Sequence, residues 1–297
     1  MPPVCHSQPF EGSSPTGADK NFVPRIWRFG EVGSCLDTAA NLAARAWLAP
    51  WGSVQVVSQT AGRGQLRRQW HSPAGNVYAA LRLPLVPPFD GMAAAPAVGA
   101  LLAEALAVDG WQVRLKWPND LVLCTSEAEP RKLAGILLEE RGGVLLAGIG
   151  INVRWSPPAE QMRADAALEA TSLAAQYKST TFAPPMAEAL WQTLVKRMFS
   201  AYINCHSFPE GWRARAESLL LWRGENVELR DDDRIVRGWL AGLGTSGGLC
   251  LNINGRLEEF ICGSLRLSPA REYGHSGMVG PGGIAAQCEA RKRVFAV

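Results

Sequence analysis

The sequence predicts an α+β domain over about residues 23–215 and a small all-β module over about 216–268. In the first part, apolar residues at helical spacing alternate with short runs rich in Val, Ile and Leu that are typical of strands. In the second part, short strands are separated by tight turns such as Gly247-Gly248 and Asn254-Gly255. This spacing is typical of a β-barrel of roughly five strands.

Helices and strands follow one another in a clear order in the first part. Leu36 to Trp47 has apolar residues at helical spacing, and Ser34 with Asp37 has the form of a capping box at its start. Further helices are expected over 92–108 and 186–202, and Arg141-Gly142-Gly143 indicates a hairpin. The strands are expected at 26–29, 53–58, 76–83, 112–117, 121–124, 132–140 and 143–153.

The two ends of the chain lack such patterns. Residues 1–22 are rich in Pro, Ser and Gly and are expected to be disordered, and 269–297 is expected to be a tail. The seven scattered cysteines indicate free thiols in a reducing compartment, and no apolar stretch has the length of about 18 residues that a membrane span needs. Because the first residues also lack an apolar signal core, we predict a cytoplasmic protein. The net charge of only +3 and the lack of an expected helix-turn-helix before Ile26 predict that it does not bind DNA.

A loop rich in glycine and arginine follows the strand at 53–58. Gly62 and Gly64 allow the backbone to approach a ligand closely. Arg63 and Arg68 offer planar cations that suit carboxylates and phosphates. The loop over 59–70 is therefore a candidate anion-binding loop, and a solvated basic loop is the alternative.

Two further segments place charged residues beside predicted strands. Lys116-Trp117-Pro118-Asn119-Asp120 follows one strand, where Asp120 could coordinate Mg²⁺ or orient an amine, although these residues are also typical of a turn. Lys132 opens another strand. It could bind a carboxylate and a phosphate together, or be an ordinary charge at a strand edge.

Glycines also lie inside a predicted strand, at Gly148 and Gly150. Glycine within a strand indicates the close approach of a ligand or of backbone. Asn152 follows and could serve an adenine or ribose as donor and acceptor, or be a polar cap of the strand.

These segments occur in a distinctive order: GRG-x₅-W, S-P-x-G-N, KWPND, K-L-A-G-I-L-x-E and G-I-G-I-N. In this order they closely resemble the biotin protein ligase family, over about Gly33 to Val153, with a weaker likeness in the C-terminal module. The resemblance implies a mixed β-sheet flanked by helices, like that of class II aminoacyl-tRNA synthetases, and a small SH3-like C-terminal barrel. Because no helix-turn-helix is expected before Ile26, we expect the monofunctional type, without a DNA-binding domain.

The resemblance implies a reaction as well. Family members activate biotin with MgATP to give biotinyl-5′-AMP and pyrophosphate, and then transfer biotin to one lysine of a biotin carboxyl carrier domain, as in acetyl-CoA carboxylase. Adenylation is needed because a free carboxylate is a poor acyl donor. Biotin is thus the expected substrate, and ATP and Mg²⁺ are the expected cofactors. Because the family often dimerises through sheet edges, a homodimer is left open.

Position in the family motifs assigns a role to each candidate residue. Arg63, Lys132 and Asp120 are the expected catalytic residues: the two cations bring the biotin carboxylate to the α-phosphate, and Asp120 serves Mg²⁺ or the incoming lysine. The expected biotin-binding residues are Ser34, Cys35, Gln59, Gly62, Arg63 and Lys132. The expected nucleotide-binding residues are Gln65, Arg68, Trp70, Asn119 and Asn152. Trp70 could instead pack in the core, and Ser34 could instead be a helix N-cap. Because the adenylate must be shielded from water, we expect the 62–70 loop to close over the ligand.

Three positions depart from the family pattern. Gln65 replaces an arginine of the usual GRGRxGRxW, Arg67 replaces a glycine, and Cys35 stands where threonine is frequent. The loss of a cation predicts weaker retention of the adenylate, which Arg67 and Arg68 could partly offset. A thiol is also a weaker hydrogen-bonding group than a hydroxyl.

Two other functions remain open at this stage. A lipoate or octanoate ligase would share the same fold, although KWPND and GRG-x₅-W favour biotin. Gln65 and Cys35 leave room for a non-catalytic, biotin-binding regulator.

Overall fold

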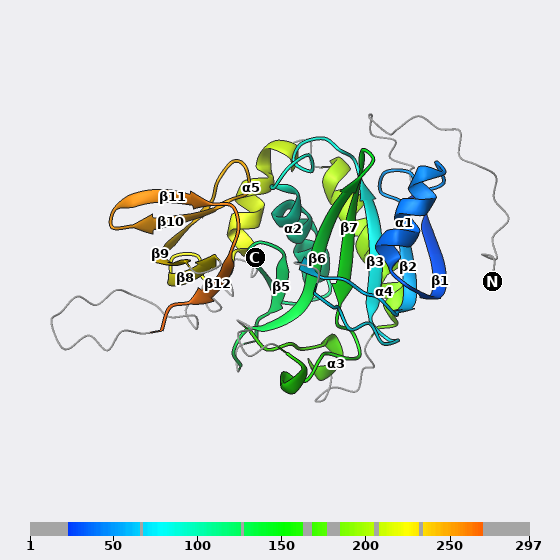
Figure 1. Cartoon of the computed structure of the whole chain (residues 1–297), viewed down its shortest axis with the longest axis horizontal. Coiled ribbons are helices and arrows are strands. Elements are labelled where there is room, and N and C mark those ends of the chain that lie inside the picture. The colour runs from blue at the N-terminus through cyan, green and yellow to red at the C-terminus, as the bar shows by residue number, and fades with distance from the viewer. Residues whose placement is uncertain are drawn as a thin grey trace, which may run out of the picture.

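The computed structural model describes residues 23–65, 68–125, 128–162, 168–176, 185–204, 208–231 and 234–269 (Figure 1). The predicted N-terminal disorder over 1–22 lies outside these residues, and so does the predicted tail apart from residue 269.

A seven-stranded mixed sheet forms the middle of the larger domain. Its first two strands pair in parallel and all the other neighbours pair antiparallel. In spatial order the strands are β1 (Ile26–Val32), β2 (Ser53–Gln59), β3 (Val77–Leu83), β7 (Val144–Ile151), β6 (Arg131–Arg141), β5 (Asp120–Leu123) and β4 (Val113–Lys116). The predicted strands and the hairpin between β6 and β7 are confirmed.

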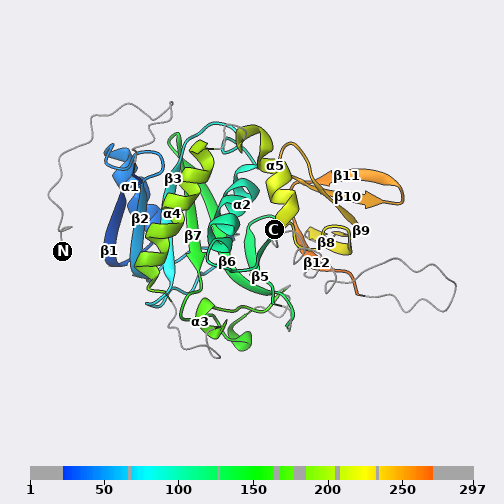
Figure 2. The ribbon, with the colours of Figure 1, turned by 180° about the vertical axis from the view of Figure 1, so that it is seen from behind.

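Helices cover both faces of this sheet. α2 (Ala94–Ala107) and α4 (Ala187–Asn204) lie on one face, and α1 (Cys35–Ala44) lies on the other (Figures 1 and 2). Successive strand residues point to opposite faces, so Leu81 belongs to the core under α2 and α4 whereas Ala80 belongs to the core under α1. The predicted mixed sheet flanked by helices is therefore confirmed.

The start of α1 differs from the prediction. Ser34 is the N-cap residue with extended backbone, but its side chain makes no capping hydrogen bond. Asp37 binds the guanidinium groups of Arg63 and Arg141 instead of the helix backbone. The predicted capping box is therefore wrong, because two cations compete for the carboxylate that would complete it.

Three helical elements were not predicted: α3 (Leu173–Gln176), a 3₁₀ turn (Ala159–Gln161) and α5 (Phe208–Leu219). The predicted domain boundary at 215 falls inside α5, which packs on α2 and touches the C-terminal sheet. Among the described residues, no helix combines the length and apolarity needed to cross a bilayer.

The C-terminal module is a five-stranded antiparallel sheet beside α5 (Figure 1). Its strands lie in the order β11 (Arg256–Phe260), β10 (Leu249–Ile253), β9 (Arg234–Leu243), β8 (Asn226–Asp231) and β12 (Ser264–Leu267). Although β12 was not expected and β9 joins two segments that were expected as separate strands, the predicted total of roughly five strands is confirmed. The predicted SH3-like barrel is not, because β11 and β12 lie at the two edges of the described sheet.

Trp117 joins the two parts of the molecule. Its side chain is fully buried, and its indole Nε1 donates a 2.9 Å hydrogen bond to the carbonyl of Gly247 in the C-terminal sheet's β9–β10 turn. Gly247 has a φ of +92°, and a Cβ there would lie 2.6 Å from the Cα of Ala93 at the start of α2. This turn therefore lies directly against the larger domain.

We expect Trp117→Phe to lower the free energy of unfolding by about 1–3 kcal/mol, because the buried Gly247 carbonyl loses its donor while the apolar contact remains. Urea unfolding followed by circular dichroism measures this change. Trp47→Phe, at a partly exposed tryptophan, is the matched control. Equal midpoints for the two variants would contradict a docking role for Trp117.

Candidate active site

A pair of glycines forms a flat floor on the α1 side of the sheet. Gly135 of β6 pairs with Gly150 of β7, and the indole of Trp70 lies against both. A Cβ on Gly150 would lie 2.7–2.8 Å from three atoms of this indole, closer than real contacts allow. Gly148 likewise makes room for Leu36 of α1, so the groups that approach these glycines are side chains, where the sequence led us to expect a ligand or backbone.

A β-bulge turns Lys132 toward Trp70. The β5–β6 register shifts so that Leu133 is the extra residue, and both Leu133 and Ala134 enter the core under α2. Bulges commonly redirect a side chain in this way. The Nζ of Lys132 lies 5.5 Å from the centroid of a Trp70 ring and 2.6 Å from Oδ1 of Asp120. The structure thus brings together three residues that are scattered in the sequence.

Lys116 adds a buried cation to this group. It pairs with Asp120 across the β4–β5 hairpin, and its side chain is almost fully buried. Burial lowers the pKa of Lys116; the negative charge of Asp120 opposes this shift, and the positive charges of Lys132 and Arg266 add to it. Arg266 comes from β12 and has a buried Nε without a hydrogen-bond partner in the described structure. Lys132 and Lys116 both lie beside Asp120, and the positive charge of Arg266 acts on Lys116, so this part of the site is suited to an anion.

A second, less charged group lies at the end of β2. The backbone N–H of Cys35 donates to Oε1 of Gln59 at 2.9 Å, and Nε2 of Gln59 donates to Oγ of Ser72 at 2.9 Å. Burial raises the pKa of the Cys35 thiol to about 12, so the thiol stays protonated at neutral pH. Ser34 is buried beside Cys35, so three of the expected biotin-binding residues do lie together.

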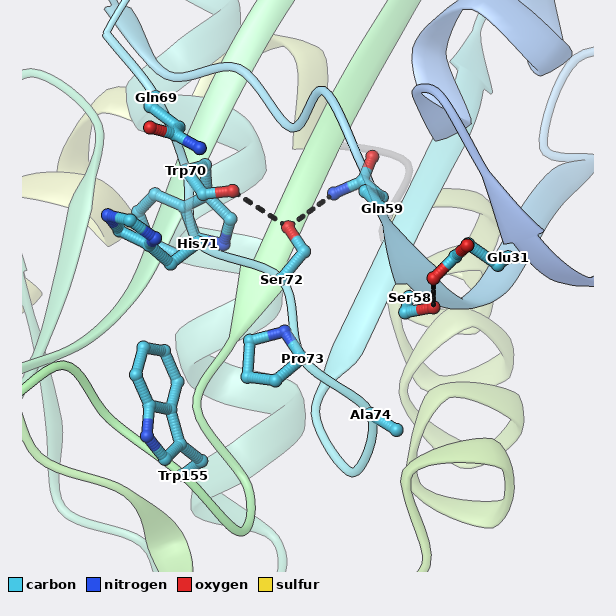
Figure 3. Close-up of a pocket in the computed structure, with 10 residues that line it drawn as sticks. All are labelled: Glu31, Ser58, Gln59, Gln69, Trp70, His71, Ser72, Pro73, Ala74 and Trp155. Atoms are coloured by element: carbon cyan, nitrogen blue, oxygen red, sulfur yellow. Dashed lines mark hydrogen bonds between the residues drawn. The ribbon is translucent and has the colours of Figure 1, made fainter.

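A groove of about 620 Å³ opens beside this group (Figure 3). Gln59, Trp70 and Ser72 line it on one side, and Trp155 lies across from them. The backbone of Gly62 packs closely here, since Trp70 donates its N–H to the Gly62 carbonyl at 2.9 Å. Trp70 thus belongs both to the groove and to the charged group around Lys132. The groove has the size of a small-molecule site.

Arg63 does not join Lys132 in the structure. Its Nη1 and Nη2 bind the two carboxylate oxygens of Asp37, both at 2.8 Å, and its Nε lies 3.4 Å from Oε1 of Glu139. Lys132 and Glu139 are seven positions apart on β6, which corresponds to roughly 23 Å along a strand. The two predicted cations therefore face different regions here.

The remaining predicted nucleotide residues divide into two kinds. Asn119 and Asn152 are buried, and their side-chain amides donate to the backbone carbonyls of Ile136 and Thr171. These bonds join Asn119 to β6 and Asn152, just after β7, to Thr171 before α3, which is a structural role in keeping with the strand-cap alternative for Asn152. Gln65 and Arg68 are exposed on the segment between Gly62 and Trp70.

The described residues contain no group of three or more acidic, histidine or cysteine side chains that could hold a metal. Asp120 is a single carboxylate and already pairs with Lys132. One carboxylate is compatible with an Mg²⁺ ion that arrives on the phosphates of a nucleotide, since such ions keep phosphate and water ligands. The donor set does not fit a resident metal centre.

Sequence reasoning missed two residues of this region. Lys116 has no separate role in the sequence analysis beyond its place in KWPND, although a lysine at the end of a strand directly before a turn was a usable signal. Asn76, from S-P-x-G-N, accepts hydrogen bonds at Oδ1 from the N–H groups of Val153, Arg154 and Trp155. It holds the chain after β7 in place, and only the fold brings these residues together.

Comparison with known proteins agrees with this geometry. Residues 35–156 match the Biotin/lipoate A/B protein ligase family. The biotin–[acetyl-CoA-carboxylase] ligase of Paracoccus denitrificans is 32% identical over 230 residues, which cover 73% of this chain and 88% of that protein. The bifunctional ligase/repressor BirA of Escherichia coli is 28% identical over 225 residues, which cover 72% of this chain and 65% of BirA. The chain thus spans slightly less than two thirds of BirA.

The fold agrees as well. The biotin protein ligase from Aquifex aeolicus, solved in complex with biotin and ATP, superposes with a TM-score of 0.64 and is 28% identical; the match covers 82% of this chain and 99% of that one. With the family motifs in order, the same sheet and helices, and a relative covered over most of its length, this chain belongs to the biotin protein ligase family.

Proposed function

We propose that this protein activates biotin with MgATP to give biotinyl-5′-AMP and pyrophosphate, and then transfers biotin to a lysine of a carboxyl carrier domain. The observation that carries the proposal is the group of Lys132, Asp120 and Lys116 beside Trp70, next to a groove of polar character. This arrangement offers cations for phosphate and, beside them, a groove lined by polar and aromatic side chains for an uncharged ring.

In the first step, an oxygen of the biotin carboxylate forms a bond to the α-phosphorus of ATP, and the bond from that phosphorus to pyrophosphate breaks. The approach of two anions is opposed by their charges. Lys132 lies beside Trp70 and would stabilise the negative charge that builds up, and Lys116 and Arg266 would add positive charge behind it. Mg²⁺ would enter and leave with the phosphates as part of the substrate.

In the second step, a lysine amine of the carrier attacks the acyl carbon, and the bond to AMP breaks. The amine must lose a proton. Asp120 is the carboxylate nearest to Lys132 and could take this proton, or it could orient the amine or the magnesium ion. The geometry is compatible with each of these roles.

The groove side would receive the uncharged ring of biotin. Gln59 is held by hydrogen bonds at both ends of its amide, so its orientation is fixed before a ligand arrives. Together with Ser34 and the backbone of Gly62, it would present buried polar groups to the ureido ring. An analogue without the ureido would leave such groups unpaired, which is a strong source of discrimination.

The family model by itself covers both biotin and lipoate ligases. Biotin is favoured by the names of the relatives and by the complex of the Aquifex aeolicus enzyme with biotin and ATP. A non-catalytic biotin-binding regulator remains the other candidate. A homodimer, loop closure over the ligand, a cytoplasmic location and the lack of DNA binding all stay predictions.

Mass spectrometry of a biotin carboxyl carrier domain, incubated with the protein, biotin and MgATP, tests the proposal. We expect the mass of one biotinyl group on one lysine, and no gain with Lys132→Ala. A gain with lipoate but not biotin would identify a lipoate ligase. If biotin binds in equilibrium dialysis but no pyrophosphate is released, the protein is a non-catalytic binder.

Gly150→Ala tests the floor beneath Trp70. The added Cβ displaces the indole, so we expect kcat/KM for biotin-dependent ATP–pyrophosphate exchange to fall by about a hundredfold. Gly30→Ala is the matched control, since a Cβ on this β1 glycine would meet nothing within 4 Å. In the Trp70→Ala background, Gly150→Ala is expected to have no further effect. An additive loss there would show that Gly150 acts by another route.

Gln65→Arg tests the missing cation of the loop. Gln65 is exposed on the segment between Gly62 and Trp70, and an added guanidinium there could bind the phosphate. We expect the dissociation rate of biotinyl-AMP to fall by about tenfold, the effect of one charge-assisted hydrogen bond. Gln161→Arg, in an exposed 3₁₀ turn, is the control. Equal dissociation rates for wild type and Gln65→Arg would refute this idea.

A further inference from the structure

Four charged side chains form an ion network where α1 meets the β6–β7 hairpin. We call the group of Asp37, Arg63, Glu139 and Arg141 the Asp37 cluster. Arg63 binds both oxygens of Asp37 and also contacts Glu139. Arg141 donates to Oδ1 of Asp37 at 2.8 Å and to Oε2 of Glu139. Two cations thus neutralise two carboxylates within one connected network.

The contacts of Arg63 use the whole guanidinium. Its Nε, Nη1 and Nη2 all donate, and the pair with Asp37 is bidentate, a geometry that arginine alone among side chains can make. The hydrogen bonds from Arg63 hold the pKa of Asp37 down at about 2, so the carboxylate stays charged at any physiological pH. Moving Arg63 toward Lys132 would leave Asp37 and Glu139 with Arg141 as their remaining partner in the cluster.

The backbone of Arg63 connects this network to Trp70. Arg63 forms an antiparallel bridge with Gln69, and the N–H of Trp70 donates to the carbonyl of Gly62 at 2.9 Å. Both ends of the segment from Gly62 to Trp70 are therefore joined at this point. The contacts that hold the Arg63 side chain against α1 and β6 therefore also hold Trp70 in its position over Gly135 and Gly150.

We infer that Arg63 anchors this segment and that Asp37 is the positioning residue that holds it, while the cationic chemistry belongs to the group around Lys132. The inference rests on the proposed function and replaces the direct contact of Arg63 with the carboxylate and phosphate that the motif implied. Through the anchor, Asp37 acts on the retention of the adenylate, which Trp70 helps to cover.

A double-mutant cycle separates an anchor from a reacting cation. Asp37→Asn, Arg63→Gln and the double variant are compared by the dissociation rate of biotinyl-AMP and by kcat and KM in pyrophosphate exchange. For an anchor, each single change raises the dissociation rate by about tenfold, because the pair is partly exposed, and the double variant equals either single. For a reacting cation, Arg63→Gln lowers kcat strongly while Asp37→Asn stays at wild type or above, and this outcome overturns the inference.

Asp109→Asn is the matched control. Asp109 makes a bidentate pair of the same kind with Arg197 of α4, at 2.7 and 2.8 Å, on the side of the sheet away from α1. We expect its adenylate dissociation rate to equal that of the wild type. An increase as large as that of Asp37→Asn would show that loss of any such pair loosens the site, and would overturn the inference.

A measurement without ligand keeps this test separate from that of the proposed function. If the wild type forms no biotinyl-AMP, the proposed function fails, and the anchor is judged from trypsin cleavage after the exposed Arg68 in the ligand-free protein. Asp37→Asn is expected to speed this cleavage about tenfold, and Asp109→Asn to leave it unchanged. Equal cleavage rates for wild type and Asp37→Asn overturn the inference.

Discussion

The absence of two Cβ atoms is the constraint on which the site depends. Gly135 and Gly150 face each other across β6 and β7, and only their bare backbone lets the indole of Trp70 lie against the sheet. Trp70 in turn borders both the groove at Gln59 and the charged group at Lys132. One aromatic side chain thus borders both the groove and the cationic group, and its position depends on the missing side chains of the two glycines beneath it.

The β6 strand carries charged side chains near both of its ends. Near its start, the bulge at Leu133 turns Lys132 toward Asp120 and Trp70. Near its end, Glu139 and Arg141 join the network of Asp37. A strand is stiff over this length, so cations held at its two ends cannot meet over one ligand without a large movement of the loop. Lys116 and Arg266 instead provide positive charge next to Lys132 from β4 and β12.

The C-terminal sheet is therefore part of the site's surroundings as well as a separate module. Trp117 binds its Gly247 carbonyl, and Arg266 approaches the buried Lys116. Both contacts are made by residues of the KWPND segment. The same short motif thus supplies a docking tryptophan, a buried cation and the carboxylate of Asp120.

The sequence by itself determined the order of the strands along the chain, the main helices, the hairpin at Arg141-Gly142-Gly143 and the family, because these rest on local periodicity and on motifs that are short and contiguous. It also indicated the close approach at Gly150, since glycine weakens the interior of a strand and is typical of places where another group packs on the bare backbone. Tertiary structure decided what each charged side chain faces. The capping box failed and Arg63 turned away from Lys132 for one reason: an ionised group binds the best-placed partner of opposite charge. Asp37 meets Arg63 and Arg141, and Glu139 meets Arg63, only after β6 and α1 have packed together.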